Sequence, residues 1–187
     1  MKYDDASWHS GDKLPKGLPD EAGATHIGMF ACWALLSGLA GDLHTQDFPE
    51  KLAGLRNRSQ TPGQFFLESC DGKLTNEDLN DEGNAFARVY YDVQRGRYLI
   101  DYEATLGGGR LASLYSVQNT WKNFDRLSPI LDRRLAEWRS GTLLSSEEAL
   151  AQQPPPPRLW LALLIRVVVA IAAILASIWL GDKLLRR

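Results

Sequence analysis

The stretch AGATHIGMFACWALLSGLAG (residues 22–41) has the pattern of a helix around which the other segments fold. Its apolar positions recur at helical spacing, and Gly41 supplies a stop. A helix that is apolar nearly all round has to be buried. Since about 15 residues are too few to cross a bilayer, we predict a core helix here and not a membrane span.

Capping and proline signals predict further helices after this one. Phe48-Pro49 opens a short helix with a basic end, Thr61-Pro62 opens another, and TNED (residues 75–78) resembles a capping box. Helical spacing also predicts a helix from Ser116 and a second that restarts at Ser128-Pro129. The predicted fold class is therefore mainly α, a single helical domain.

Residues 84–106 fit two patterns. Their apolar and aromatic residues recur at helical spacing, but Tyr98, Ile100 and Tyr102 also alternate as in a strand, with Arg95-Gly96 as the turn of a hairpin. We favour helices, because the neighbouring segments are helical and an isolated hairpin is only marginally stable. A small β-hairpin near residues 85–105 is the alternative.

The stretch LWLALLIRVVVAIAAILASIWL (residues 159–180) is long and apolar enough to cross a membrane. As a helix it spans about 33 Å, and Trp160 and Trp179 lie near its two ends, where indole rings meet the membrane interface. A buried core helix is the alternative, and Arg166 is the evidence for it. On insertion scales, however, a central Arg costs about 2.5–3.5 kcal/mol, whereas the Leu, Ile and Val residues return about 4–8 kcal/mol. We predict a transmembrane anchor.

These patterns divide the chain into an acidic globular domain (1–140), a proline-rich linker (141–157) and a membrane anchor with a short basic tail (158–187). The first 157 residues hold 16 Lys and Arg against 22 Asp and Glu, a net charge of −6, whereas the rest carry +4. An acidic domain argues against nucleic-acid binding and is compatible with a basic protein partner. Because no basic segment followed by an apolar one opens the chain, we expect no signal peptide and a single-pass protein whose domain is cytoplasmic.

The sequence contains no catalytic or cofactor-binding motif in the required context. Its three histidines show no metal-ligand spacing, so we expect no catalytic residue, no metal site and no cofactor. Cys32 lies in an apolar run and is expected in the core, whereas Cys70 with His44 as a nucleophile pair finds no support in the spacing.

Polar residues that a partner can contact gather in three places: the turn-rich arm of residues 1–20, the start of the core helix and the acidic segment 71–82. We expect the arm to be ordered and pinned by Tyr3 and Trp8. For Trp8 a lid on the core is the competing interpretation, and for His26 a first-turn residue satisfied by hydrogen bonds. The candidate partner-binding residues are Asp4, Asp5, Trp8, His9, His26, Asp71, Asp78, Asp81 and Glu82.

Four motifs carry a resemblance to a known family: YDDASWH, EAGATHIGMF, CDGKLTNEDLNDEGNAFA and NTW. In these the chain resembles a family of uncharacterised bacterial domains of unknown function, over most of Tyr3–Arg139. The resemblance transfers no catalytic residue. Small acidic proteins of such families are often immunity proteins that neutralise secreted toxins, and this is the function that the resemblance implies.

Two classes of function follow. The first is a protein-binding module, an immunity protein anchored in the bacterial inner membrane, whose acidic face occludes the basic site of a toxin such as a nuclease. The second is a metal-dependent enzyme that uses the histidine and carboxylate arm around His9 and His26, and a membrane-tethered scaffold is a further alternative. A stoichiometric metal after purification would favour the enzyme.

The anchor also predicts self-association. Small residues, with Arg166 among them, follow one another at steps of three and four, so on a helix they form one stripe. The stripe consists of Ala162, Arg166, Ala170, Ala173 and Ser177. Small residues let two helices approach closely in lipid, where packing drives association.

We expect that replacing Ala170 and Ala173 together by Leu abolishes crosslinking between copies of the chain in membranes. The control replaces Val168 and Val169 by Leu, which leaves the stripe intact and should preserve the crosslinks. Equal crosslinking of both variants would mean that the stripe reflects composition only.

Overall fold

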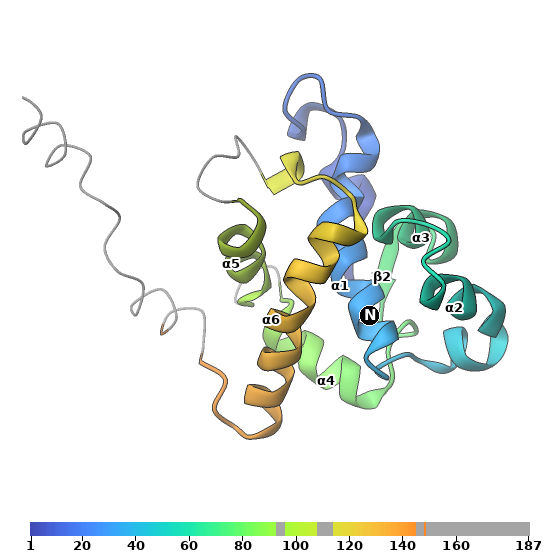
Figure 1. The fold of residues 1–187 in the computed structure, drawn as a ribbon, viewed down its shortest axis with the longest axis vertical. Coiled ribbons are helices and arrows are strands. Elements are labelled where there is room, and N and C mark those ends of the chain that lie inside the picture. Colours follow the sequence, from blue (N-terminus) through green and yellow to red (C-terminus); the bar gives the residue numbers. More distant parts are fainter. Residues whose placement is uncertain (93–95, 108–113, 145–147, 149–187) are drawn as a thin grey trace, which may run out of the picture. The chain divides into compact units, whose positions relative to one another are not determined.

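The computed structural model describes residues 1–92, 96–107, 114–144 and 148 (Figure 1). Met1–Leu150 form one compact unit. The predicted anchor, with Trp160, Arg166, Ala170, Ala173 and Trp179, and most of the predicted linker lie outside the described residues. Within the part of the chain that is described, no helix is both long enough and apolar enough to cross a bilayer.

The predicted core helix is present as α1 (Thr25–Leu36), and every residue from Thr25 to Leu35 is buried. A short 3₁₀ turn, η3 (Asp20–Ala24), leads into it. Helix α3 (Pro62–Ser69) packs closely against α1, where a Cβ on Gly28 would lie only 2.7 Å from the carbonyl oxygen of Pro62. The chain therefore needs glycine at this position for the two helices to approach.

The two short helices after the core helix were predicted correctly. Helix α2 (Pro49–Arg56) begins at a proline and follows a π-helical turn, η4 (Leu43–Asp47). At the start of α3, Thr61 and Gln64 form a capping box, which satisfies backbone N–H groups that the first turn leaves free. In Figure 1, α2 and α3 lie on one side of α1 and α6 lies on the other.

The arm is ordered, as expected, but part of it is a strand that the sequence pattern did not predict. Strand β1 (Lys2–Asp5) pairs antiparallel with β2 (Lys73–Thr75), and Asp5 lies opposite Lys73. Two 3₁₀ turns, η1 (Ala6–His9) and η2 (Gly11–Lys13), follow β1. The pairing attaches the beginning of the chain to a segment some 70 residues away.

The hairpin alternative near residues 85–105 is wrong. This region contains α4 (Asp81–Tyr90) and α5 (Tyr98–Tyr102), followed by the π-helical turn η5 (Glu103–Gly107). The ambiguous aromatic residues face the core, where Tyr90, Tyr98 and Tyr102 are buried. Thr75 and Asp78 do hydrogen-bond as in a capping box, but they close a turn, and the helix begins later, capped by Asn80.

The last helix, α6 (Trp121–Arg139), corrects two predicted boundaries. We expected one helix from Ser116 and a second from Ser128-Pro129, but Ser116 belongs to a separate 3₁₀ turn, η6 (Leu114–Ser116). Helix α6 is capped by the Thr120 side chain and runs through Pro129 without a break. Its apolar stripe of Phe124, Leu127, Leu131 and Leu135 is buried, and this burial stabilises the helix despite the hydrogen bond that proline cannot make.

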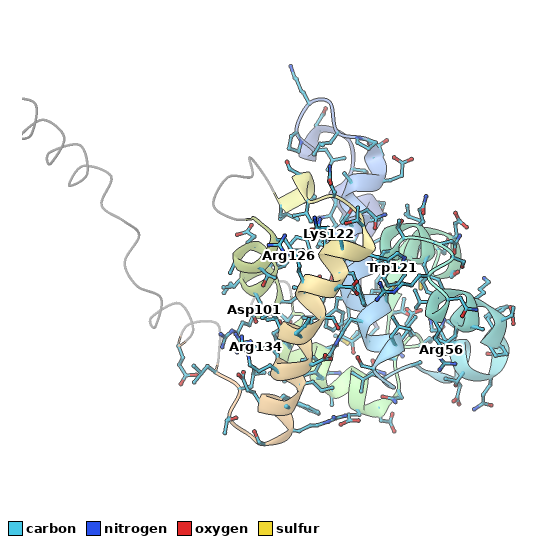
Figure 2. The ribbon with its side chains drawn as sticks, viewed as in Figure 1. Arg56, Asp101, Trp121, Lys122, Arg126 and Arg134 are labelled. Atoms are coloured by element: carbon cyan, nitrogen blue, oxygen red, sulfur yellow. The ribbon has the colours of Figure 1, made fainter. Side chains whose placement is uncertain are left out.

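An ion pair attaches α6 to α5. The Arg134 guanidinium donates to both carboxylate oxygens of Asp101, at 2.8 and 2.9 Å, and also to Glu137 (Figure 2). Asp101 and Arg134 are both 7% exposed, and Tyr90 Oη donates a further hydrogen bond of 3.0 Å to Asp101. Removing Arg134 leaves the buried Asp101 carboxylate with only the longer, 3.5 Å contact to Arg97 as charge compensation.

Replacing Arg134 by Ala should therefore lower the free energy of unfolding by about 3 kcal/mol, measured by urea denaturation. The control is Arg133→Ala, on the same helix, whose contact with Glu137 is 3.7 Å long and solvent-exposed. That variant should change the stability by no more than about 0.5 kcal/mol. A similar loss in both variants would contradict the importance of the buried pair.

Candidate functional site

Three polar residues that the sequence singled out meet in the structure. Asp4 lies in β1, His9 ends η1, and His26 lies in the first turn of α1. His9 Nε2 is 2.7 Å from Asp4 Oδ1, and His26 Nε2 is 3.7 Å from Asp4 Oδ2. The two imidazole rings meet edge to face, with 4.7 Å between their centroids. We call these three residues the Asp4 cluster.

Two local features hold His9 in place. The Asp5 side chain accepts hydrogen bonds from the backbone N–H and the hydroxyl of Ser7, and so caps the turn that ends at His9. On the other side, Gly23 lies so close to the backbone of His9 that a Cβ at this position would overlap it. The arm can therefore reach the start of α1 only because residue 23 is glycine.

Tyrosines from other elements surround the Asp4 cluster. Tyr91 Oη donates to Asp4 Oδ2 at 2.7 Å, and Tyr115 Oη is 2.9 Å from His9 Nδ1. The ring of Tyr102 lies edge-on to His26, with 6.3 Å between centroids. His26 Nδ1 and Tyr102 Oη are both buried and have no hydrogen-bond partner among the described residues.

Burial and hydrogen bonding set the charge of the cluster. Burial by itself would raise the pKa of Asp4, but hydrogen bonds from His26, His9 and Tyr91 outweigh it and hold this pKa well below its usual range. Burial also lowers the pKa of His26, an effect that Asp4 only partly offsets. At neutral pH the site therefore holds a carboxylate next to a neutral, fully buried imidazole.

A pocket of about 290 Å³ lies near the cluster and is lined by residues next to it, not by Asp4, His9 or His26 themselves. Tyr115, which contacts His9, and Thr25, which precedes His26, both line it. The side chain of His9 is 19% exposed, whereas those of Asp4 and His26 are 1% exposed. Solvent therefore reaches the cluster from the side of His9.

A second polar feature is an acidic groove of about 460 Å³ between η4 and the start of α4. Its lining includes four exposed carboxylates, from Asp42, Asp47, Glu77 and Asp81, and no Lys or Arg. None of the four forms an ion pair within the described part of the chain. Their negative charge is therefore not neutralised by neighbouring side chains.

A third cluster joins His44, Cys70 and Asp78, all buried. The structure thus brings Cys70 and His44 together, as the nucleophile-pair hypothesis required. Burial, and then the charge of Asp78, raise the pKa of the Cys70 thiol well above its usual value, so it remains a protonated thiol. A nucleophilic cysteine needs the opposite shift and access to substrate, so the geometry does not favour this hypothesis.

The other predicted partner-binding residues divide by exposure. Asp4, Asp5, His26 and Asp78 are buried, so their side chains are not available to a partner, and His9 is partly exposed. Trp8 is 43% exposed with Lys2 over its ring, Asp71 pairs with Lys73, Glu82 pairs with Arg139, and Asp81 lines the acidic groove. Of the nine predicted partner-binding residues, five therefore remain at least partly exposed: Trp8, His9, Asp71, Asp81 and Glu82.

The sequence did not predict some of the residues that complete the acidic groove and the Asp4 cluster. Asp42 and Asp47 share the groove with Glu77 and Asp81 although they lie at least 30 residues earlier in the chain. Tyr91 and Tyr115, which contact Asp4 and His9, carried only the signal of core aromatics. No local spacing links such residues, because tertiary packing brings them together.

A family model described as Domain of unknown function (DUF7832) matches residues 2–117. The chain belongs to this family. The resemblance was expected to extend to Arg139, but the DUF7832 match ends before α6. No curated protein and no solved structure matches the chain. Every residue of the Asp4 cluster and every carboxylate of the acidic groove lies within the matched range.

Gly23→Ala should displace the arm from α1, because the added methyl overlaps the His9 backbone. We expect a loss of about 1–3 kcal/mol of stability, measured by urea denaturation, and a changed environment of the His9 ring, measured by NMR. The control is Gly107→Ala, whose Cβ would be no closer than 3.9 Å to a neighbouring side chain. An unshifted His9 resonance in Gly23→Ala would contradict this account of the arm.

Proposed function

We propose that the chain is a protein-binding module of the immunity type, whose acidic groove receives a basic element of a toxin. The observation that carries the proposal is the set of four unpaired carboxylates around one groove. A nuclease is a suitable target, because an enzyme that acts on nucleic acid carries basic residues at its site. Occupying that site with acidic side chains blocks its substrate.

The lining of the groove suits an arginine or lysine side chain. Leu43 and Leu79 provide apolar surface next to the carboxylates. A long basic side chain can pack its methylene groups against such surface while its charged end meets the carboxylates. Arginine is favoured as the inserted residue, because its guanidinium can bind a carboxylate through two parallel hydrogen bonds.

The backbone around the groove is well braced. Gly41 N–H donates to Asp78 O at 2.9 Å, and Asn80 N–H donates to Leu39 O at 2.9 Å, so the two segments that carry the carboxylates are joined directly. A side chain on Gly41 would overlap the backbone at Glu77. A groove held in this way loses little conformational entropy on binding, which favours affinity.

The charge of the whole domain supports the same partner. The first 157 residues carry a net charge of −6, which attracts a basic protein and raises the rate of encounter. In the proposed arrangement the predicted anchor tethers the chain to the bacterial inner membrane, with the acidic domain in the cytoplasm where an incoming toxin would act.

We expect that Glu77→Gln combined with Asp81→Asn slows association with the toxin encoded by the neighbouring gene and reduces its salt dependence. Dissociation should change less, because exposed charges act mainly on encounter. Association is measured by stopped-flow mixing at two ionic strengths. The matched control is Asp12→Asn combined with Glu103→Gln, which removes the same charge from exposed positions outside the groove lining.

Equal association rates for the two double variants would contradict the groove as the binding site. The immunity role has a separate test, in which the toxin and the chain are produced together in one cell. Failure of the unmodified chain to restore growth would contradict that role.

A further inference from the structure

We propose that the Asp4 cluster is a binding site for a divalent transition-metal ion of the zinc class. Each of Asp4, His9 and His26 offers one ligand atom, and these atoms all lie within 4.8 Å of one another. Two imidazoles and one carboxylate form a ligand set found in catalytic zinc sites. This proposal does not rest on the acidic groove, and a bound metal here would favour the metal-dependent alternative, which uses the same histidines, over the immunity role.

Two ligand distances can be compared with those of a tetrahedral site, one to each carboxylate oxygen of Asp4. With metal–ligand bonds of about 2.0–2.2 Å, neighbouring ligand atoms of a tetrahedral site lie roughly 3.4 Å apart. His26 Nε2 and Asp4 Oδ2 are 3.7 Å apart, close to this value. His9 Nε2 and Asp4 Oδ1 are 2.7 Å apart and have to separate by about 0.7 Å as the metal replaces their hydrogen bond.

The groups behind the ligands already hold them in position. Tyr115 Oη contacts His9 Nδ1, which leaves Nε2 of that ring for the metal. Tyr91 Oη and the backbone N–H of Asp5 donate to the Asp4 carboxylate and fix its orientation. Such outer contacts are characteristic of metal-binding histidines and carboxylates.

The inner side of the site has polar groups that the described protein does not satisfy. His26 Nδ1 and Tyr102 Oη are buried without a hydrogen-bond partner among the described residues. An unpaired buried polar atom is costly. A metal at His26 Nε2 would lie on the other side of the ring from Nδ1, so it would not by itself pair these two groups.

The charges are also suitable for a dication. The Asp4 carboxylate and the two imidazoles supply oxygen and nitrogen donors of the kind that zinc binds, and these donors lie within 4.8 Å of one another. Three protein ligands leave the fourth position of a tetrahedral ion open, as in catalytic zinc sites. His9, whose side chain is 19% exposed, is the ligand through which solvent reaches the cluster.

The cluster of His44, Cys70 and Asp78 is the competing site within the same chain. It is fully enclosed, and its thiol would have to lose a proton whose pKa burial raises. His44 Nδ1, like His26 Nδ1, is buried without a partner among the described residues, so it is the enclosure of the His44 cluster that separates the two sites. We therefore assign the metal to the Asp4 cluster.

The full-length chain in detergent, stripped with chelator, is titrated with Zn²⁺ against a chromophoric competitor and with Co²⁺ by absorption spectroscopy. We expect one Zn²⁺ per chain, and Co²⁺ bands of a four- or five-coordinate site without the near-ultraviolet thiolate band that Cys70 would produce. His9→Ala should weaken Zn²⁺ binding at least tenfold, and because His9 is partly exposed this variant is expected to fold. Tyr115→Phe should weaken it about tenfold through loss of the outer contact.

The matched control is His44→Ala, which removes a histidine of the competing cluster and should leave the affinity unchanged. Three results would overturn the assignment: no Zn²⁺ binding at micromolar concentration, equal affinity in the unmodified chain and His9→Ala, or a thiolate band that disappears in His44→Ala. Circular dichroism of each variant confirms that a lost metal does not reflect a lost fold.

Discussion

The burial of α1 on all sides is the constraint on which the rest of this structure depends. A helix without a solvent face has to be covered by several elements at once, and α3 and α6 approach it from different sides. Close approach requires small residues, as at Gly28. It also requires a partner for each polar group on the helix, and the indole N–H of Trp33 finds one in Asp132 of α6. His26 has the same need, which the arm meets by bringing Asp4 to it.

Three carboxylates inside this domain show how the neighbouring donor decides what a buried acid can do. Asp101 is neutralised by the permanent charge of Arg134, so it stabilises the junction of α5 and α6 and offers nothing to a ligand. Asp78 contacts His44 but also accepts from Thr75, within an enclosed site. Asp4 faces a neutral imidazole and a tyrosine and lies next to a partly exposed histidine. Only the last of these three arrangements combines a carboxylate, two imidazoles and access from solvent.

The acidic groove and the Asp4 cluster represent two different uses of negative charge. The groove carboxylates are exposed and unpaired within the described residues, so their electric field extends into the solvent. The Asp4 carboxylate is buried and interacts only with the side chains that contact it directly, such as His9 and Tyr91. Part of the acidity that the sequence shows as a single surplus therefore lies in the interior, and four of the carboxylates that remain exposed gather at the groove.

The sequence by itself determined the elements whose signals are local. The apolar pattern of residues 22–41 predicted α1, proline with a capping residue predicted α2 and α3, and the Asp, Glu and His content pointed to the arm and the acidic segment. Membership of the family is also a property of the sequence, because the family model is matched to the amino acids of residues 2–117. Only the tertiary structure decided what depends on distant residues. It paired β1 with β2 and formed helices in the described part of residues 84–106. It also let α6 continue through Pro129, because the buried face of that helix stabilises it. It also joined Asp42 and Asp47 to Glu77 and Asp81, and Asp4 and His9 to His26, because contacts between segments arise from packing around α1 and leave no periodic signal in any one of them.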